Sequence, residues 1–400
     1  MDSTATSYVR DRVTVTTRPY LDYYAKNKII PVRQNISDLQ IHLKRRSILF
    51  YYLKIPPAAV RGQRVLEIGP GTGDNAIHIA SLAPKKYTLL DGNPHSIAAV
   101  NEKIQDTRFA FRALQDLQCI ETDFVQYDGT DLYDLVLCEG IIPAQDDCAA
   151  FARRAARFVD IDGLLVVTCH SAISLLSEVC RRLIKPILFS NAEDSARILS
   201  DAIELFTPHL EQLPGRSRVI EDWVRDNILQ PWPETIVFSI EDALNAVGQE
   251  FYLFGTSPQF IQDFRWYKAA AVDEVSLNDL ARRQLEYWAP IFIDYRVDPG
   301  DFVGLDSSDL ESKCRAILRN AHVAWTTDDL DLVSDCIQSL EKLRRDLSLV
   351  FPTTAASIKD FVVGTDALLR GKHAEFHEFR GWFGRGQQYV SFLRHDNRLR

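Results

Sequence analysis

The chain has 400 residues, which is enough for about two or three domains and for a core that needs no disulfide or metal. Hydrophobic residues make up 46% and charged residues 25%, which excludes a globally disordered protein. The net charge of -9 argues against binding of nucleic acid by bulk electrostatic attraction. The seven cysteines are widely spaced and form no C-x-x-C pair, so we expect reduced thiols and no metal site.

The N-terminus is polar, and no apolar segment of a secretory signal follows it. No run of about 18 apolar residues occurs in the sequence, so no membrane-spanning helix is predicted. These features predict a cytoplasmic protein with no membrane partner.

Residues 1–60 are expected to form an N-terminal helical cap. Ser37, three residues before Gln40, fits a capping box that would start a helix. The helix is predicted to run to about Leu53 and to end before Pro56-Pro57.

Short apolar runs alternate with helical stretches between residues 61 and 170. Helices are predicted at 74–83 and 149–159. Continuous apolar strands that alternate with helices are typical of a parallel sheet covered on both faces. The five predicted strands are residues 64–68, 87–91, 117–121, 134–138 and 163–168.

The alternation stops after residue 170, and residues 171–234 are predicted to form a helical insertion after the fifth strand. Strand signals return at 235–238 and 251–254, with a weaker one at 264–268. Residues 235–270 are therefore assigned to the same sheet as 61–170.

Residues 271–400 carry almost no strand signal. Apolar residues at helical spacing predict one long amphipathic helix over 328–350. We expect a helical C-terminal extension, which is a candidate surface for homo-oligomer formation.

The first strand ends in a glycine-rich turn, Gly69, Gly71 and Gly73, that opens a helix. Glycine has no Cβ, so a ligand can approach the backbone of such a turn. A dinucleotide fingerprint spaces its glycines G-x-G-x-x-G. Here the third glycine comes one residue early and Asp74 stands in its usual place, which fits a pyrophosphate poorly.

Two acids follow the next two strands. Asp91 ends the second strand, where a carboxylate can accept both ribose hydroxyls of a nucleoside. Asp123 follows the third strand, where it can accept the adenine amino group while the ring of Phe124 packs on the base. Asp123 also fits a surface loop, because further aspartates follow it closely. Glycine turn and acids together predict a nucleoside cofactor.

Over roughly 61–170 and 235–268 the sequence resembles the class I S-adenosylmethionine-dependent methyltransferase superfamily. Its first motif resembles residues 65–73, and its closing antiparallel hairpin resembles 248–268. The resemblance implies an α/β, doubly wound, mostly parallel seven-stranded sheet with helices on both faces. It also implies S-adenosyl-L-methionine as cofactor and a set of contact residues, namely Glu67, Gly69, Gly71, Thr72, Gly73, Asp91, Gly92, Asn93, Asp123, Phe124 and Glu139.

Methyl transfer from a sulfonium needs an aligned nucleophile, and a base helps when the acceptor is a hydroxyl. His170 follows the fifth strand and Glu139 the fourth, so both are candidate catalytic residues at the ligand-binding edge. His170 also fits a strand-end histidine that is satisfied by backbone. Glu139 could instead contact the cofactor.

The leading hypothesis is a methyltransferase that acts on an oxygen or nitrogen atom of a small molecule, a glycan unit or a biosynthetic intermediate. The insertion would roof the site, exclude water and shape an acceptor pocket. Protein and DNA substrates usually need an open face, and the net negative charge also disfavours DNA. The alternatives are another transfer on the same fold, such as aminopropyl transfer, and a non-catalytic cofactor-binding scaffold or partner subunit.

Overall fold

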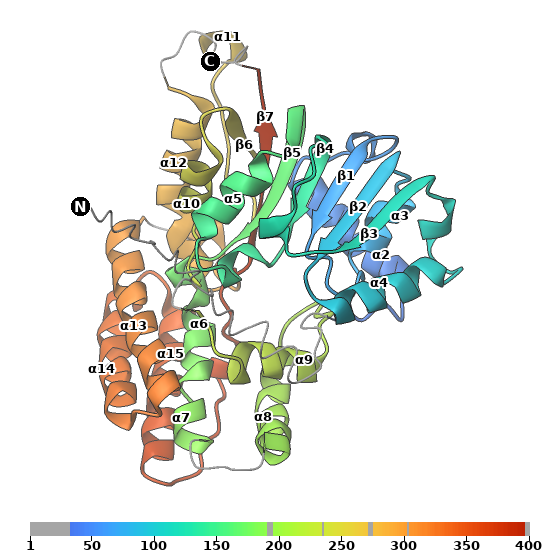
Figure 1. Cartoon of the computed structure of the whole chain (residues 1–400). Coiled ribbons are helices and arrows are strands. Elements are labelled where there is room, and N and C mark those ends of the chain that lie inside the picture. The colour runs from blue at the N-terminus through green and yellow to red at the C-terminus, as the bar shows by residue number, and fades with distance from the viewer. Residues whose placement is uncertain (1–32, 190–194, 234–235, 271–274, 302–303, 397–400) are drawn as a thin grey trace, which may run out of the picture.

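The computed structural model describes residues 33–189, 195–233, 236–270, 275–301 and 304–396. This part of the chain contains a seven-stranded sheet of order β3-β2-β1-β4-β5-β7-β6, in which β7 runs antiparallel to both neighbours (Figure 1). The predicted doubly wound, mostly parallel sheet is thus confirmed. The strands are β1 (Arg64–Ile68), β2 (Lys86–Asp91), β3 (Asp116–Glu121), β4 (Tyr133–Cys138), β5 (Val159–Cys169), β6 (Phe251–Ser257) and β7 (Gln388–Arg394).

Alternate residues of each strand face opposite sides of the sheet, and both sides are apolar. Val65 and Leu89 pack into one core cluster, and their neighbours Leu66 and Leu90 pack into the other. The first cluster is covered by α2 (Leu39–Tyr52), α3 (Ala76–Ser81) and α4 (Pro94–Gln105), and the second by α5 (Cys148–Ala156), α10 (Ile240–Val247) and α12 (Leu277–Trp288).

Helix α2 begins one residue later than the capping box predicts. Asp38, not Ser37, is the N-cap, and its carboxylate accepts from the amide of Ile41 at 3.0 Å. The helix ends at Tyr52, before Pro56, as the prolines require. Residues 1–32 of the predicted N-terminal cap lie outside the described residues.

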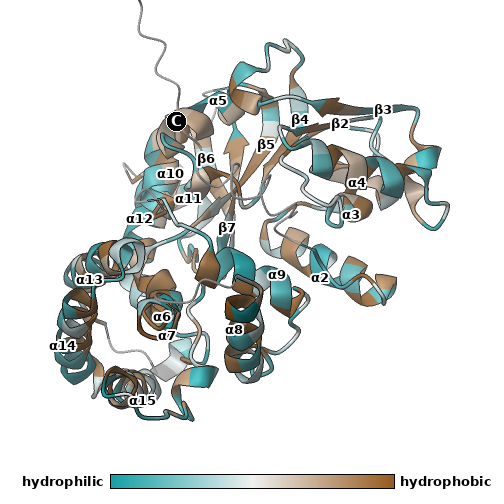
Figure 2. Ribbon diagram, turned by 60° about the horizontal axis from the view of Figure 1, so that its bottom comes forward, coloured by the Kyte–Doolittle hydropathy of each residue, from teal (hydrophilic) through white to brown (hydrophobic). Residues whose placement is uncertain are grey.

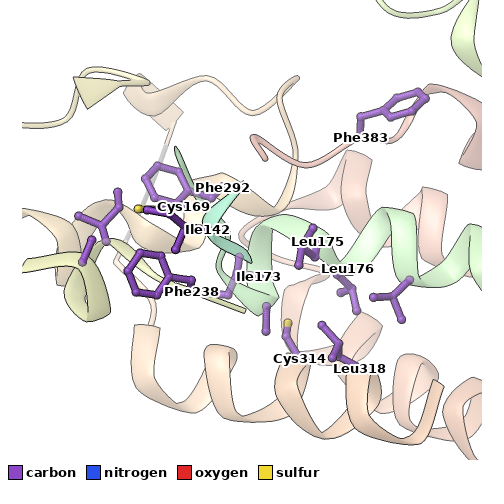
Figure 3. Close-up of a cluster of buried hydrophobic side chains, with 14 of the residues drawn as sticks. Ile142, Cys169, Ile173, Leu175, Leu176, Phe238, Phe292, Cys314, Leu318 and Phe383 are labelled. Atoms are coloured by element: carbon purple, nitrogen blue, oxygen red, sulfur yellow. The ribbon is translucent and has the colours of Figure 1, made fainter. Parts of the chain in front are cut away.

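The insertion after β5 is helical, as predicted. It contains α6 (Ala172–Arg182), α7 (Lys185–Leu188), α8 (Ser195–Leu210) and α9 (Ile220–Val224). Ile173, Leu175 and Leu176 of α6 pack in a buried cluster with Cys314 and Leu318 of α13 (Ser307–Thr327) (Figure 3). The insertion therefore shares its core with the C-terminal helices.

The C-terminal helices continue with α14 (Leu330–Leu347) and α15 (Pro352–Leu369), and each packs on the one before it. Figure 2 shows α6 and α7 lying among α13, α14, α15 and α8. In the described part of the chain, none of the helices is both long and apolar enough to cross a bilayer.

The predicted end of the sheet is wrong in three respects. Residues 264–268 form no strand, and Tyr267–Ala270 is a helical turn, α11. Within the described part of 235–238, Phe238 makes only an isolated bridge to His170. The partner of β6 is β7, from the end of the chain, so the closing strand pair is not 248–268. In chain order, the helical C-terminal region therefore lies between β6 and β7. Strand β7 returns to the sheet, where it pairs with both β5 and β6 and buries Val390 and Phe392.

Candidate functional site

The chain leaves β1 in a loop that only glycine forms easily. Gly69, Gly71 and Gly73 have φ values of +71°, +57° and +76°, in the left-handed region. A Cβ added to Gly71 would meet no atom within 4 Å. At Gly71 the loop therefore presents bare backbone to open space at the carboxyl edge of the sheet, where such folds bind ligands.

Asp91, at the end of β2, lies against this loop. Its Oδ2 accepts from the amide of Gly71 at 3.2 Å, and its Oδ1 accepts from the amide of Asn93 at 2.8 Å. Burial raises the pKa of Asp91, and these bonds oppose that effect. Asn93 in turn caps α4 by accepting from His95. Asp91 is thus held in one orientation beside the glycine loop.

The ends of β2 and β3 also meet. A Cβ added to Gly92 would lie 3.5 Å from Cα of Asp123. Asp123 caps a short turn by accepting from the amide of Val125 at 3.1 Å. The structure therefore brings the glycine loop, Asp91 and Asp123 to one edge, although they come from three successive strands.

Phe124 does not fit the role expected for it. Its ring is 4% exposed and lies 5.0 Å from the ring of Phe151 and 5.6 Å from that of Phe158, measured between centroids. The ring belongs to the core under α5, so it is not available to stack on an adenine. The sequence shows that an aromatic residue follows the strand, but it does not show whether the ring faces the core or the ligand.

Glu67 is buried at the end of β1 and accepts a hydrogen bond from the hydroxyl of Tyr87. Burial raises the pKa of Glu67 to about 7, although the Tyr87 bond acts in the opposite direction. A carboxyl group with this pKa changes its protonation state near neutral pH, close to the glycine loop.

Glu139, at the end of β4, is bound by Arg46 of α2. The two guanidinium nitrogens donate to its two carboxylate oxygens at 2.9 and 2.7 Å, and the side chains are 8% and 12% exposed. Asn75 also reaches one of these oxygens at 3.5 Å. Because Arg46 occupies both oxygens, the geometry disfavours Glu139 as a general base.

His170 is held by backbone through its amide and one ring nitrogen, which agrees in part with the backbone-satisfied environment that the sequence left open. Its amide donates to the carbonyl of Phe238 at 2.8 Å, and its ring donates to the carbonyl of Ile236. Nδ1 is buried and has no partner among the described residues. Burial lowers the pKa of His170 to about 4, so the ring is neutral at pH 7 and a weak base. This environment disfavours the predicted catalytic role.

In the sequence, Asp74 stands out only because it fits a pyrophosphate poorly. In the structure, Asp74 contacts the glycine loop, α4 and α2. It is 4% exposed, accepts from Thr72 Oγ1 at 2.7 Å, and pairs with Lys103 of α4 at 3.0 Å. Its backbone carbonyl lies 2.8 Å from His42 Nε2. Asp74 therefore fixes the glycine loop against α2 and α4.

A cavity of about 500 Å³ lies between α2 and α3. It is lined by Ser47, Phe50 and Tyr51 of α2 and by His78 of α3. A second cavity, of about 640 Å³, lies among α5, α10 and α13. Neither cavity is lined by the glycine loop or by Asp91.

Residues 59–204 match the family model of a methyltransferase domain. This span contains the glycine loop, the acids at the ends of β2 and β3, Glu139 and His170. A search of curated proteins found no match.

Solved structures that match part of this chain include the N-methyltransferase NodS from Bradyrhizobium japonicum WM9 with S-adenosyl-L-homocysteine, at 16% identity and a TM-score of 0.30 over 38% of this chain and 74% of that one. Magnesium protoporphyrin IX methyltransferase from Synechocystis PCC 6803 with bound S-adenosylmethionine has the same identity, TM-score and coverage. At these values the likeness carries no argument about the acceptor.

Proposed function

We propose that this chain is an S-adenosyl-L-methionine-dependent methyltransferase that methylates an oxygen or nitrogen atom of a small molecule, a glycan unit or a biosynthetic intermediate, and the match of residues 59–204 to a methyltransferase domain supports this proposal. The observation that carries the proposal is the contact between Asp91 and Gly71, 3.2 Å from carboxylate to amide. It places a fixed carboxylate beside a loop of bare backbone, which suits a ribose next to the rest of a nucleoside cofactor.

The cofactor contacts are proposed residue by residue. The backbone of Gly69, Gly71 and Gly73 forms the floor of the site, Asp91 accepts the ribose hydroxyls, and Asp123 accepts the adenine amino group. These groups lie at or just after the carboxyl ends of β1, β2 and β3, and the pairing of these strands holds them in place. The buried carboxyl of Glu67 is proposed to face the cationic end of the cofactor, since a positive charge stabilises its ionised form.

When bound, S-adenosyl-L-methionine supplies a methyl group on a sulfonium, which is a strong electrophile. The task of the chain is then to align the acceptor atom and to exclude water. Because Glu139 is held by Arg46 and His170 by backbone, we propose an acceptor that needs no strong base. A neutral amine or an acidic hydroxyl meets this condition.

The helical insertion supports a small or medium-sized acceptor. It begins directly after β5, at the edge that carries the site, and Arg33 ties it to the N-terminal segment through Asp222. Such covers shape a pocket and exclude water, while a duplex needs an open basic face. A cytoplasmic location and self-association through the C-terminal helices remain part of the proposal. No disulfide joins any of the cysteines in the described part of the chain.

The proposal is tested by a methyl-transfer assay with S-adenosyl-L-methionine carrying a tritiated methyl group. The acceptor panel contains primary amines, phenols and catechols, and oligosaccharides. We expect label in one amine or phenol class and release of S-adenosyl-L-homocysteine in equal amount. Aminopropyl transfer from decarboxylated S-adenosylmethionine, with no methyl transfer to any acceptor, would contradict the proposal.

A further inference from the structure

Residues 33–35, called the strap below, connect the glycine loop to the helical insertion. On one side, the amide of Gln34 donates to Asp74 Oδ2 at 2.8 Å. On the other side, the amide of Asn35 donates to the carbonyl of Ser217 at 2.6 Å, and Gln34 forms an antiparallel bridge with Arg218. The strap therefore lies between two parts of the chain that are far apart in sequence.

The side chain of Arg33 fixes the strap to α9. Its Nε and a terminal nitrogen donate to the two carboxylate oxygens of Asp222 at 2.8 and 2.6 Å. The Asp222 side chain is 2% exposed, and that of Arg33 is 54% exposed. A buried carboxylate that loses its partner is costly, so the strap and α9 are expected to move together.

The loop side of the strap depends on one carboxylate. Oδ2 of Asp74 accepts from both Gln34 and Thr72, while Oδ1 pairs with Lys103. Asp74 directly follows Gly73, the last glycine of the loop. A displacement of the loop therefore changes the hydrogen bond that holds the strap.

We infer that Asp74 is a positioning residue that holds residues 33–35 as a latch, so that closure of the insertion and retention of the cofactor are coupled. The inference rests on the proposed cofactor site at the glycine loop. A cofactor that orders the loop also orders Asp74, and Asp74 then holds the strap and, through Arg33, α9. Release of the product S-adenosyl-L-homocysteine requires the bond between Gln34 and Asp74 to break.

A single substitution can remove the hydrogen bond between the Gln34 amide and Asp74 and leave the neighbouring backbone hydrogen bonds in place. In the bridge to the insertion the donors are the amides of Asn35 and Val219, so the amide of Gln34 serves only Asp74. Gln34→Pro deletes this amide and leaves the two bridge donors. Gln34→Ala is the matched control, because it keeps the amide and loses only the side-chain contact with Ser217.

The first measurement is the dissociation rate of S-adenosyl-L-homocysteine by stopped-flow displacement. Loss of a hydrogen bond to a charged group predicts a rate about ten- to 100-fold faster in Gln34→Pro. Gln34→Ala is expected to stay within about two-fold of wild type. Equal rates in the two variants, both with wild-type thermal unfolding midpoints, would overturn the latch.

The second measurement is hydrogen exchange of residues 217–224, with and without S-adenosyl-L-homocysteine. In the wild-type chain the ligand is expected to slow exchange there, and Gln34→Pro is expected to remove this effect. A purely structural role of the strap would not make exchange depend on the ligand. Exchange in the wild type that does not respond to bound ligand overturns the coupling, even if the proline variant does not fold.

Failure of the latch and failure of the cofactor site give different results. Gly71→Val blocks the loop and is expected to abolish binding of S-adenosyl-L-homocysteine. Normal binding by Gly71→Val would contradict the site, and the latch with it. Lost binding in Gly71→Val together with unchanged release from Gln34→Pro would contradict only the latch.

Discussion

Arg46 of α2 and Glu139 of β4 form a two-pronged ion pair, with nitrogen–oxygen distances of 2.9 and 2.7 Å, at the edge of the sheet that carries the cofactor site. The pair joins a helix that precedes the sheet to the strand next to the glycine loop. Because Arg46 binds both of its oxygens, Glu139, one of the two candidate catalytic residues, has a structural role instead.

Removal of Arg46 should destabilise the protein because it leaves a nearly buried carboxylate without its partner. Arg46→Ala is expected to lower the free energy of unfolding by roughly 3–5 kcal/mol, measured by urea denaturation. Lys44→Ala, an exposed change on the same helix, should cost less than about 0.5 kcal/mol. Similar losses in the two variants would show that the pair does not hold α2 on the sheet.

His170 gives a prediction about acid stability. Its pKa is about 4 in the folded protein and about 6.5 when unfolded, so the unfolded chain binds more protons between these values. The free energy of unfolding should therefore rise with pH from 4 to 6.5, by up to roughly 1.4 kcal/mol per unit for this group. His170→Gln should flatten the rise in urea titrations at several pH values, and exposed His373→Gln should not.

The same His170→Gln variant tests catalysis once an acceptor is known. Because the ring is held by backbone, kcat is expected to stay within about three-fold of wild type. General-base catalysis would instead require a loss of roughly 10²–10⁴. A loss of that size with unchanged cofactor affinity would restore His170 as the base.

Glu67 gives the opposite pH dependence. Its pKa of about 7 lies above the usual value of 4.5, so the folded protein binds more protons between these pH values and stability falls as pH rises. Glu67→Gln keeps an acceptor for Tyr87 and removes the charge. The stability of this variant relative to wild type should be roughly 1–3 kcal/mol greater at pH 8 than at pH 5. An equal difference at both pH values would contradict the assignment.

The position of β7 predicts that the C-terminal residues are part of the catalytic fold. Phe392 is fully buried between β5 and β6, so Phe392→Ala is expected to cost roughly 3–5 kcal/mol in urea denaturation. Leu349→Ala, at a side chain that is 95% exposed, should be near neutral. A near-neutral Phe392→Ala would mean that the sheet closes without this strand.

The strands up to β5 could be predicted because each is a local apolar run, and Asp91 could be identified because it ends such a run. β7 is not predicted because its partners lie far away in sequence, although Tyr389, Val390, Phe392 and Leu393 form a short, mostly apolar run. The bond between Arg46 and Glu139 spans 93 positions, and nothing local indicates it. For His170 and Phe124, sequence located the residue but not the direction of its ring.

The most direct test of the account is isothermal titration calorimetry of S-adenosyl-L-homocysteine binding to wild type, Asp91→Ala and Glu121→Ala. Glu121 lies beside Asp91 in the β2–β3 register and is exposed, so it controls for loss of charge at the same edge. The account predicts one site per chain, affinity reduced roughly 10–100-fold in Asp91→Ala, and no change in Glu121→Ala. Unchanged affinity in Asp91→Ala would contradict the cofactor site.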